Sequence, residues 1–235
     1  MTSFLLFDIA VATTTINIEH YESLFDQPPP KEAIRSHSKI LKGGITTGID
    51  RSGLQPVGWG TTIFPYSIEQ VWRGLNHEEN HVVLSPVSKT TIIKGSACAE
   101  NRQVFMQLPI PFLDDRWWIT EQNTNIKLEK QSLGKMRELS WKKIPTVQSL
   151  EYKTQGIINP SGIEVEETRG SWILYEVNEE ETIGIYHSYV DPGGYLPAGP
   201  INSLAAGSIS DTIVAMQNYI SHIPSNSCHM KKFTN

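Results

Sequence analysis

The sequence predicts an α+β fold in which an antiparallel sheet packs against one long C-terminal helix. Six strand-like segments follow one another in the middle of the chain without an intervening helix, and this order favours antiparallel pairing. The last segment leads through a corner of prolines and glycines into a helix-like run at residues 201–221. Apolar side chains recur along this run at helical spacing, which indicates that one of its faces lies on the sheet.

The length and composition of the chain favour one domain with an appendage. Its 235 residues are 39% hydrophobic and 19% charged, which is enough for one sizeable core. Residues 1–50 lack sustained periodicity and contain three consecutive prolines at residues 28–30. We therefore expect a partly ordered N-terminal arm or edge elements here, with a short helix at residues 31–41. The main domain is expected at residues 51–223 and a flexible tail at residues 224–235.

The charge balance argues against nucleic acid as a partner. The formal net charge is −5 and the pI is near 5.8, whereas phosphate binding needs clustered Lys and Arg. Compact basic pairs occur only at residues 142–143 and 231–232, which does not support a polybasic membrane anchor either. The two cysteines, Cys98 and Cys228, lack C-x-x-C spacing and indicate neither a disulfide scaffold nor a cysteine zinc site.

The predicted domain begins with a strand at residues 58–64 and a helix at residues 68–75. Ser67 and Gln70 can form a capping box at the start of this helix, whose apolar residues line one face. Turn signals, such as the polar run at residues 178–180, separate the strands that follow. We expect these strands at residues 89–94, 102–108, 116–128, 136–143, 162–177 (broken near Arg169) and 182–190.

Alternation along the strands predicts a sheet with one apolar and one solvated face. Val104 and Met106 share one side of their strand, and Ile183 and Ile185 continue on one side toward His187. The final helix offers an apolar stripe to the dry face of the sheet. This stripe consists of Ile201, Leu204, Ala205, Ser208, Ile209, Thr212, Ile213, Met216 and Ile220.

Three motifs occur in order along the second half of the chain. A proline-aromatic run at residues 108–118 closes on an Asp-Arg pair, and residues 170–172 form a Gly-Ser-Trp motif. The corner before the last helix contains Asp191, Pro192, Gly193, Gly194, Pro197 and Asn202. In this order the motifs resemble those of START lipid-binding domains, in the wider SRPBCC (Bet v1-like) helix-grip superfamily. The resemblance covers roughly residues 58–222.

The resemblance implies a helix-grip fold, in which the sheet is curved around the C-terminal helix and leaves a hydrophobic cavity between them. It implies that the chain binds a small hydrophobic ligand, such as a lipid, sterol or fatty-acid-like molecule, as a carrier or sensor. Transient membrane contact fits this role, and no cofactor or metal is implied. The alternative is a cyclase or dehydratase, in which Arg116, His187 and Tyr189 would polarise a polyketide-like substrate in the same cavity.

The candidate ligand-binding residues combine apolar walls with a few polar anchors. Small residues along the helix would leave space for a ligand, although close helix-on-sheet packing without a cavity explains them equally well. Arg116 needs an acidic partner, either Asp114 or Asp115 or the headgroup of a ligand. The proposed set is Met106, Arg116, Trp118, Trp141, Leu174, Ile185, His187, Leu204, Ala205 and Ser208.

Residues 77–81 formally match the H-E-x-x-H zinc pattern. On a helix this pattern would place His77 and His81 on one face with a glutamate as base. Asn76 and Asn80 interrupt a helix at this place, and no third ligand can be identified. We therefore predict a solvated turn and no metal site.

The first residues hint at a signal peptide, since residues 4–12 are largely apolar. Asp8 interrupts this run, however, and no Lys or Arg precedes it. We expect a cytoplasmic protein, whereas an atypical signal peptide here would make it secreted or periplasmic. No run approaches the ~20 apolar residues that a membrane-spanning helix needs.

Overall fold

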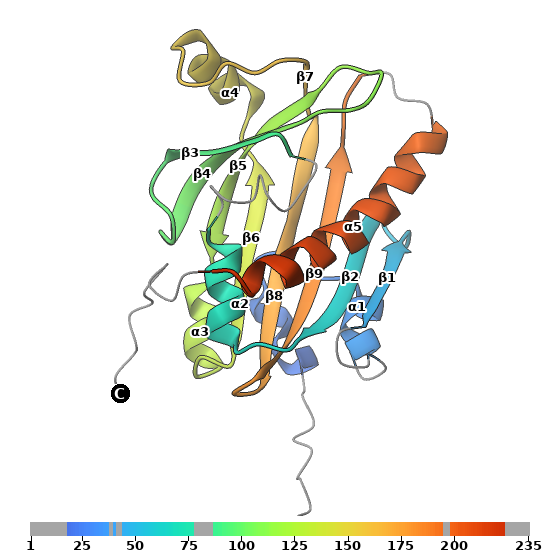
Figure 1. Ribbon diagram of the computed structural model, residues 1–235, viewed down its shortest axis with the longest axis vertical. Coiled ribbons are helices and arrows are strands. Elements are labelled where there is room, and N and C mark those ends of the chain that lie inside the picture. Colours follow the sequence, from blue (N-terminus) through green and yellow to red (C-terminus); the bar gives the residue numbers. More distant parts are fainter. Residues whose placement is uncertain (1–17, 38–39, 41–43, 78–86, 195–197, 224–235) are drawn as a thin grey trace, which may run out of the picture.

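A computed structural model of the chain shows a curved sheet with a long helix, α5 (Ala198–Ile220), lying across its concave face (Figure 1). It describes residues 18–37, 40, 44–77, 87–194 and 198–223, and the side chains of α5 from residue 209 onward. The first 17 residues, including the apolar run at residues 4–12, lie outside the described part.

The sheet has nine strands within the described residues: β1 (Ile45–Asp50), β2 (Val57–Phe64), β3 (Lys89–Lys94), β4 (Asn101–Leu108), β5 (Arg116–Thr124), β6 (Met136–Lys143), β7 (Ile163–Glu164), β8 (Glu167–Asn178) and β9 (Glu181–Asp191). They are ordered β1-β2-β9-β8-β6-β5-β4-β3, and β7 pairs with β5. Only the β5–β7 pair is parallel among these. The predicted α+β class and helix-grip arrangement are confirmed.

The other helices of the described part are the 3-10 helix η1 (Ile18–Leu24), α1 (Lys31–Ser36), α2 (Ile68–Leu75), α3 (Ile126–Gln131) and α4 (Thr146–Thr154). Helix α2 begins and ends where the sequence predicts, and its capping box is present. Gln70 N donates to Ser67 Oγ over 3.3 Å, while Ser67 N donates to Gln70 Oε1 over 3.1 Å.

Two short helices that the sequence did not reveal interrupt the strand order. The strand predicted at residues 116–128 ends at Thr124, because Asn125 caps α3 by accepting a hydrogen bond from Leu128 N over 2.9 Å. Helix α4 follows Pro145. Both helices are too short to show a clear apolar period. The break predicted near Arg169 falls earlier, between β7 and β8.

Helix α5 packs closely on β2 because two residues of that strand have no side chain. Ile209 lies over Gly58, and a Cβ at Gly60 would come within 2.5 Å of Ile213 Cδ1. Farther along the helix, Met216 and Ile220 join the core cluster that contains Trp72 and other residues of α2. The predicted stripe is therefore confirmed from residue 209 onward.

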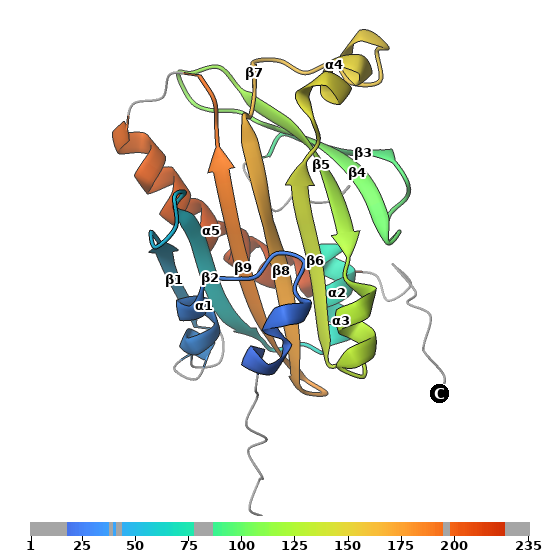
Figure 2. The same cartoon turned by 180° about the vertical axis from the view of Figure 1, so that it is seen from behind.

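The opposite, convex face is also covered, so the predicted division into one dry and one wet face is wrong. Helices η1, α1 and α3 lie on this face (Figure 2), and α4 covers the end formed by β4 and β5. Ile173, Ile183 and Ile185 are buried here against apolar residues of the N-terminal segment, including Ile18 and Ile34. The N-terminal segment lacks a clear period of its own, so the sequence did not reveal this layer.

A buried hydrogen-bond network, here called the polar joint, connects the N-terminal segment to the convex face. The Glu138 carboxylate accepts hydrogen bonds from the backbone N–H of Asp26 (2.8 Å) and Gln27 (2.9 Å) and from Asn125 Nδ2 (2.7 Å). His187 Nε2 lies 3.0 Å from the Gln27 carbonyl oxygen, to which it donates. Burial raises the pKa of Glu138, and burial lowers the pKa of His187 to about 4, so that its imidazole is neutral at pH 7.

His187→Gln should remove an acid-dependent loss of stability. The unfolded chain takes up a proton at this histidine near pH 6.5, whereas the folded chain does so only near pH 4, so the free energy of unfolding falls as pH decreases through this window. The wild-type protein should lose up to about 3 kcal/mol relative to the variant between these pH values. Urea unfolding at pH 7, 5.5 and 4.5 measures this difference.

The glutamine can still donate a hydrogen bond to the Gln27 carbonyl, so the comparison isolates the titration. The raised pKa of Glu138 has the opposite effect on pH dependence, and it cancels because both proteins contain this residue. A difference in stability that does not change with pH would contradict the placement of a neutral His187 in this joint.

Candidate ligand-binding site

Large side chains gather on the concave face of β4, β5 and β6, beyond the strands on which α5 mainly packs. Met106 is paired with Trp118 across β4 and β5, and Gln122 with Trp141 across β5 and β6. Because alternate residues of a strand share a face, Trp118 and Gln122 lie on the same face as Trp141. The side chains of Met106, Trp118 and Trp141 are only half-buried. The sheet thus presents apolar surface there.

An aromatic row crosses the same face toward α2. The rings of Trp141 and Tyr186 stack with centroids 5.7 Å apart, and Tyr186 contacts Trp172 at 4.8 Å. The ring centroid of Trp172 in turn lies 6.2 Å from that of Phe64. Burial raises the pKa of the Tyr186 hydroxyl, so this row carries no charge at neutral pH. The aromatic row forms an apolar floor beside Trp118 and Met106.

Three neutral polar atoms on the concave face have no hydrogen-bond partner in the described part of the chain: Thr90 Oγ1, Thr120 Oγ1 and Gln122 Oε1. The side chains belong to residues that are 8%, 2% and 5% exposed, respectively. A buried polar atom without a partner costs about 1–3 kcal/mol. Sequence analysis did not select these residues, although strand alternation from Trp118 would have placed Thr120 and Gln122 on its face.

Arg116 does not bind a carboxylate, contrary to expectation. Its Nε donates to the Pro192 carbonyl oxygen over 2.8 Å, its Nη1 to that of Asp114 over 2.6 Å, and its Nη2 to that of Gly193 over 3.3 Å. The residue is 3% exposed. Each guanidinium nitrogen therefore donates a hydrogen bond to a backbone oxygen. Arg116 links β5 to the corner before α5 and does not act as an anchor for a ligand headgroup.

The corner has the backbone geometry that its glycines suggest. Gly193 and Gly194 have φ values of +65° and +64°, which L-residues with a side chain rarely adopt. The Asp191 carboxylate accepts a hydrogen bond from Gly193 N over 3.1 Å. Pro197 lies outside the described residues, and Asn202 lies in α5 where side chains are not described.

The structure does not bring the predicted site residues together in one place. Met106, Trp118 and Trp141 lie together on the concave face, whereas Leu174 is fully buried in the core under α2 and α5. The assignment of Ile185 and His187 to the cavity is corrected, because alternation along β9 places both in the convex layer. Leu204, Ala205 and Ser208 belong to α5, at positions whose side chains are not described.

The residues named for the enzyme alternative are not brought together. Arg116 is bonded to backbone oxygen, and His187 is sealed under the N-terminal segment on the other side of the sheet. Tyr189 shares that side and lies under the guanidinium of Arg169, 4.5 Å from it. A catalytic group that combines Arg116, His187 and Tyr189 is therefore ruled out by their positions.

Comparison with known proteins identifies the fold. No family model matches the chain, and no curated protein matches its sequence. Solved structures do match: a STAR-related lipid transfer protein from Xanthomonas axonopodis has a TM-score of 0.61 at 13% identity, covering 77% of this chain and 96% of that one. Human STARD10 has a TM-score of 0.62 at 13% identity, and the match covers 86% of this chain and 84% of STARD10. The chain has the START fold.

Human StAR-related lipid transfer protein 5 gives a third match, with a TM-score of 0.55 at 13% identity over 87% of this chain and 96% of that one. The similarity therefore extends over nearly the whole START fold rather than one motif. None of the helices that the structure describes has both the length and the apolar character needed to cross a lipid bilayer.

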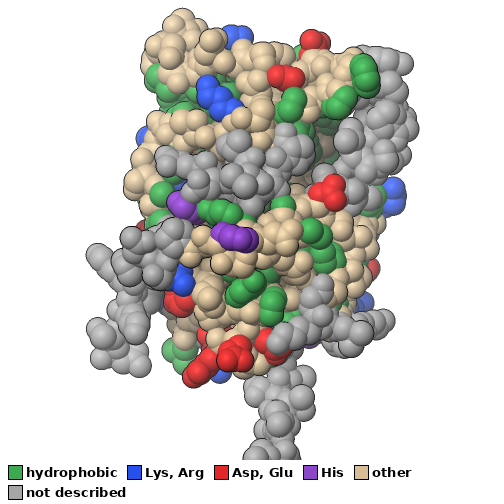
Figure 3. All heavy atoms as spheres, viewed as in Figure 1, with side chains coloured by type: hydrophobic (Ala, Val, Ile, Leu, Met, Phe, Trp, Pro, Cys, Tyr) green, Lys and Arg blue, Asp and Glu red, His purple; other side chains and the backbone are tan. Residues whose placement is uncertain are grey.

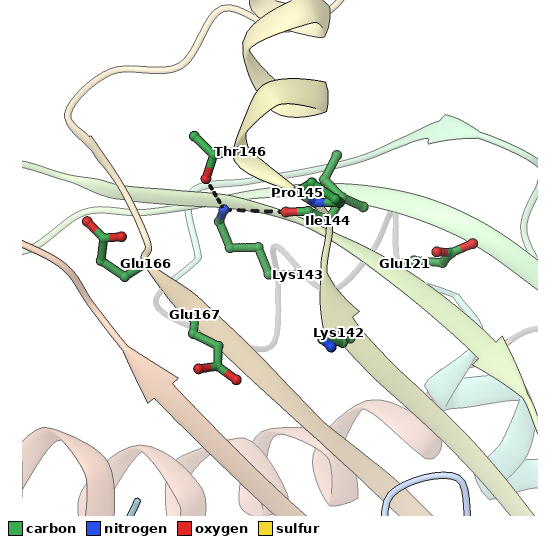
Figure 4. Close-up of a pocket in the computed structure, with 8 residues that line it drawn as sticks. All are labelled: Glu121, Lys142, Lys143, Ile144, Pro145, Thr146, Glu166 and Glu167. Carbon is green, nitrogen blue, oxygen red and sulfur yellow. Dashed lines mark hydrogen bonds between the residues drawn. The ribbon is translucent and has the colours of Figure 1, made fainter.

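A separate groove lies outside the sheet–helix space of the START fold. It has a volume of about 550 Å³ and is lined mainly by charged and polar residues from β5, β6, the start of α4 and the β7–β8 connection (Figure 4). Glu121 and Lys142 pair across β5 and β6 on the face opposite Trp141. Lys143 is paired with Glu164 at 2.8 Å. This groove does not have the apolar lining expected for a lipid.

The histidine and cysteine positions considered for metal binding have other surroundings. His77 Nδ1 is hydrogen-bonded to the hydroxyl of Tyr219 in α5, and His81 lies outside the described residues. Cys98 is disulfide-bonded, whereas the sequence indicated no disulfide scaffold; Cys228 also lies outside. Within the described part of the chain, no group of three or more His, Cys, Asp or Glu residues is placed to hold a metal.

Gly193→Val should destabilise the protein by more than ~1 kcal/mol, because φ is positive at this position. A Cβ there would also lie 3.0 Å from Glu166 Cγ and 3.1 Å from the Glu164 carbonyl oxygen. Thermal unfolding measures the effect. Gly53→Val is the control, since that glycine is exposed and its Cβ would approach only the Gln55 carbonyl oxygen, at 3.9 Å. Equal melting temperatures for the two variants would show that the corner does not require glycine.

Proposed function

We propose that this chain binds a hydrophobic molecule, such as a lipid, sterol or fatty-acid-like compound, and acts as a lipid carrier or sensor. The site lies between the concave face of β4, β5 and β6 and the N-terminal half of α5. The observation that carries the proposal is the half-buried apolar surface of Met106, Trp118 and Trp141, on the same face as α5 but beyond its main contacts with β1, β2, β9 and α2. Two structures of the same fold are named as lipid transfer proteins, which supports this role.

The energetics favour an apolar ligand on this face. Each methylene group removed from water contributes ~0.8 kcal/mol, so an acyl chain or a fused-ring molecule gains on the order of 10 kcal/mol before ordering costs. This contribution is not directional, and it predicts tolerance for different hydrocarbon shapes. Leu204, Ala205 and Ser208 remain the proposed wall residues on the helix side.

Met106→Trp should leave the protein folded and abolish lipid uptake, because the larger ring would occupy the space of the ligand. A face already filled by protein would instead be overpacked, with a loss of ~1–3 kcal/mol in stability. Native mass spectrometry of the purified protein, followed by lipid extraction, measures uptake, and thermal unfolding measures stability. Leu150→Trp is the control, because Leu150 is 50% exposed on α4. Wild-type protein that carries no lipid and binds no apolar dye would refute the proposal.

We also propose transient membrane contact through the loop between β4 and β5. Phe112 is fully exposed there with a φ of +65°, and Leu113 is 44% exposed. The loop between β4 and β5 lies at the top of the molecule in Figure 1, and apolar side chains reach the surface at the top of the same view in Figure 3. An exposed aromatic side chain at a loop tip gains free energy when it enters the apolar part of a membrane interface.

Phe112→Asp should weaken binding to phosphatidylcholine vesicles about tenfold, since the variant loses the burial of one aromatic ring. Vesicle co-sedimentation provides the measurement. Leu133→Asp is the matched control: Leu133 is 86% exposed, also has a positive φ (+54°), and lies beyond the other end of β5. Equal loss of binding in both variants would mean that the β4–β5 loop is not the contact.

A further inference from the structure

Two buried polar atoms of β5 indicate which chemical group the ligand carries at one end. Thr120 and Gln122 are two residues apart on one strand, so they share a face with their Cα atoms ~7 Å apart. Both residues are buried, and neither Thr120 Oγ1 nor Gln122 Oε1 has a hydrogen-bond partner among the residues that the structure describes. The cross-strand neighbours of Thr120 are Val104 and Lys143, and those of Gln122 are Arg102 and Trp141.

The lack of partners is specific to this face. On the convex face the buried Glu138 carboxylate has three hydrogen bonds, and the Thr61 hydroxyl donates to the Ala33 carbonyl oxygen over 3.0 Å. In the described part of the chain, the neutral buried atoms without partners are those of Thr90, Thr120 and Gln122, all on the concave side; the remaining ones are guanidinium nitrogens. The neutral buried atoms without partners among the described residues therefore lie on the concave side, and two of the three belong to β5.

The chemistry of the two atoms selects the group that completes them. Gln122 Oε1 is a carbonyl oxygen, which only accepts hydrogen bonds, so its partner must carry a hydrogen. The Thr120 hydroxyl can donate as well as accept. One hydroxyl group satisfies both, because it donates to Gln122 and accepts from Thr120. A carboxylate or phosphate has no hydrogen for Gln122 and would leave its oxygen facing a negative charge.

The cations near this pair are already bonded within the protein. Arg102, the cross-strand neighbour of Gln122, donates to the Ala99 carbonyl oxygen and to Asn76 Oδ1, both over 2.9 Å. Lys143, the neighbour of Thr120, is paired with Glu164, and Arg116 is bonded to backbone oxygen. These cations already donate to oxygen atoms of the protein, so an anionic headgroup would have to compete with those bonds. Burying an anion without partners costs far more than burying a hydroxyl.

We propose that Thr120 and Gln122 bind the hydroxyl group of an uncharged amphiphile, whose hydrocarbon part lies on Met106, Trp118 and Trp141. This inference rests on the proposed function and deepens it by naming the ligand class. The site discriminates between molecules with the same hydrocarbon chain by their polar end.

Competition between three ligands of equal chain length tests the proposal. Full-length delipidated protein is loaded with the neutral dye N-phenyl-1-naphthylamine, which is then displaced by 1-hexadecanol, hexadecanoate or hexadecane. The wild-type protein should bind hexadecanol about tenfold or more tightly than either of the others, the factor expected for one buried hydrogen-bonded group. Thr120→Val and Gln122→Met should each reduce this preference about tenfold.

Thermal unfolding of the ligand-free variants separates ligand recognition from a structural role. Replacing an unpaired buried polar group by an apolar group of similar shape removes a penalty, so Thr120→Val and Gln122→Met should melt at or above the wild-type temperature. Thr61→Val is the matched control, because this hydroxyl is buried and bonded to Ala33 on the other face. It should melt lower and keep the preference for hexadecanol.

The possible outcomes separate a failure of the hydroxyl proposal from a failure of the proposed hydrophobic binding. If all three ligands displace the dye equally, or hexadecanoate binds best, the hydroxyl proposal is overturned while hydrophobic binding stands. Loss of stability in Thr120→Val comparable to Thr61→Val would also overturn it, because the hydroxyl would then have a structural role. If neither the dye nor any of the ligands binds, the proposed function fails and this inference fails with it.

Discussion

The contact between α5 and β2 determines the arrangement of the whole concave face. Ile209 and Ile213 lie directly on Gly58 and Gly60, so any side chain at these glycines would push the helix away from the sheet. The helix is thereby held toward β1, β2 and β9, and its C-terminal half is fixed on α2 by Met216 and Ile220. The large side chains of β4, β5 and β6 lie beyond these contacts.

The two faces of the sheet use polar groups in opposite ways. The convex face joins Glu138 and His187 to the backbone of residues 26 and 27, so its polar atoms hold two parts of the chain together. On the concave face, Thr120 Oγ1 and Gln122 Oε1 have no hydrogen-bond partner among the described residues, and aromatic side chains lie on the same face. Such a division is expected of a sheet in which one face serves stability and the other serves binding.

Sequence reasoning recovered the fold because its signals are local. Strand alternation, the capping box at Ser67 and the glycine corner near Gly193 each depend on a few neighbouring residues. The candidate site could be predicted only in part, since which segments cover each face of the sheet depends on residues far away along the chain. The placement of Ile185 and His187 shows this limit: their alternation was recognised, but only the packing of the N-terminal segment shows that their face is buried.

The same reasoning explains why Arg116 was misjudged. An arginine beside two aspartates suggests an ion pair, yet its partners are carbonyl oxygens of Pro192 and Gly193, more than 70 residues away along the chain. Backbone oxygens leave no trace in a sequence, because every residue has one. Conversely, Thr120 and Gln122 are common strand residues, and what makes them notable is the absence of a partner.

The N-terminal segment also bears on which part of this chain can exist as an autonomous folding unit. A protein that began at residue 51 would expose Ile173, Ile183 and Ile185 to water, and the Glu138 carboxylate would lose the two backbone donors of Asp26 and Gln27. Loss of β1 would further open the edge of β2, and an unprotected edge strand readily pairs with another molecule. The described residues of this segment therefore cover both the convex face and one edge of the sheet.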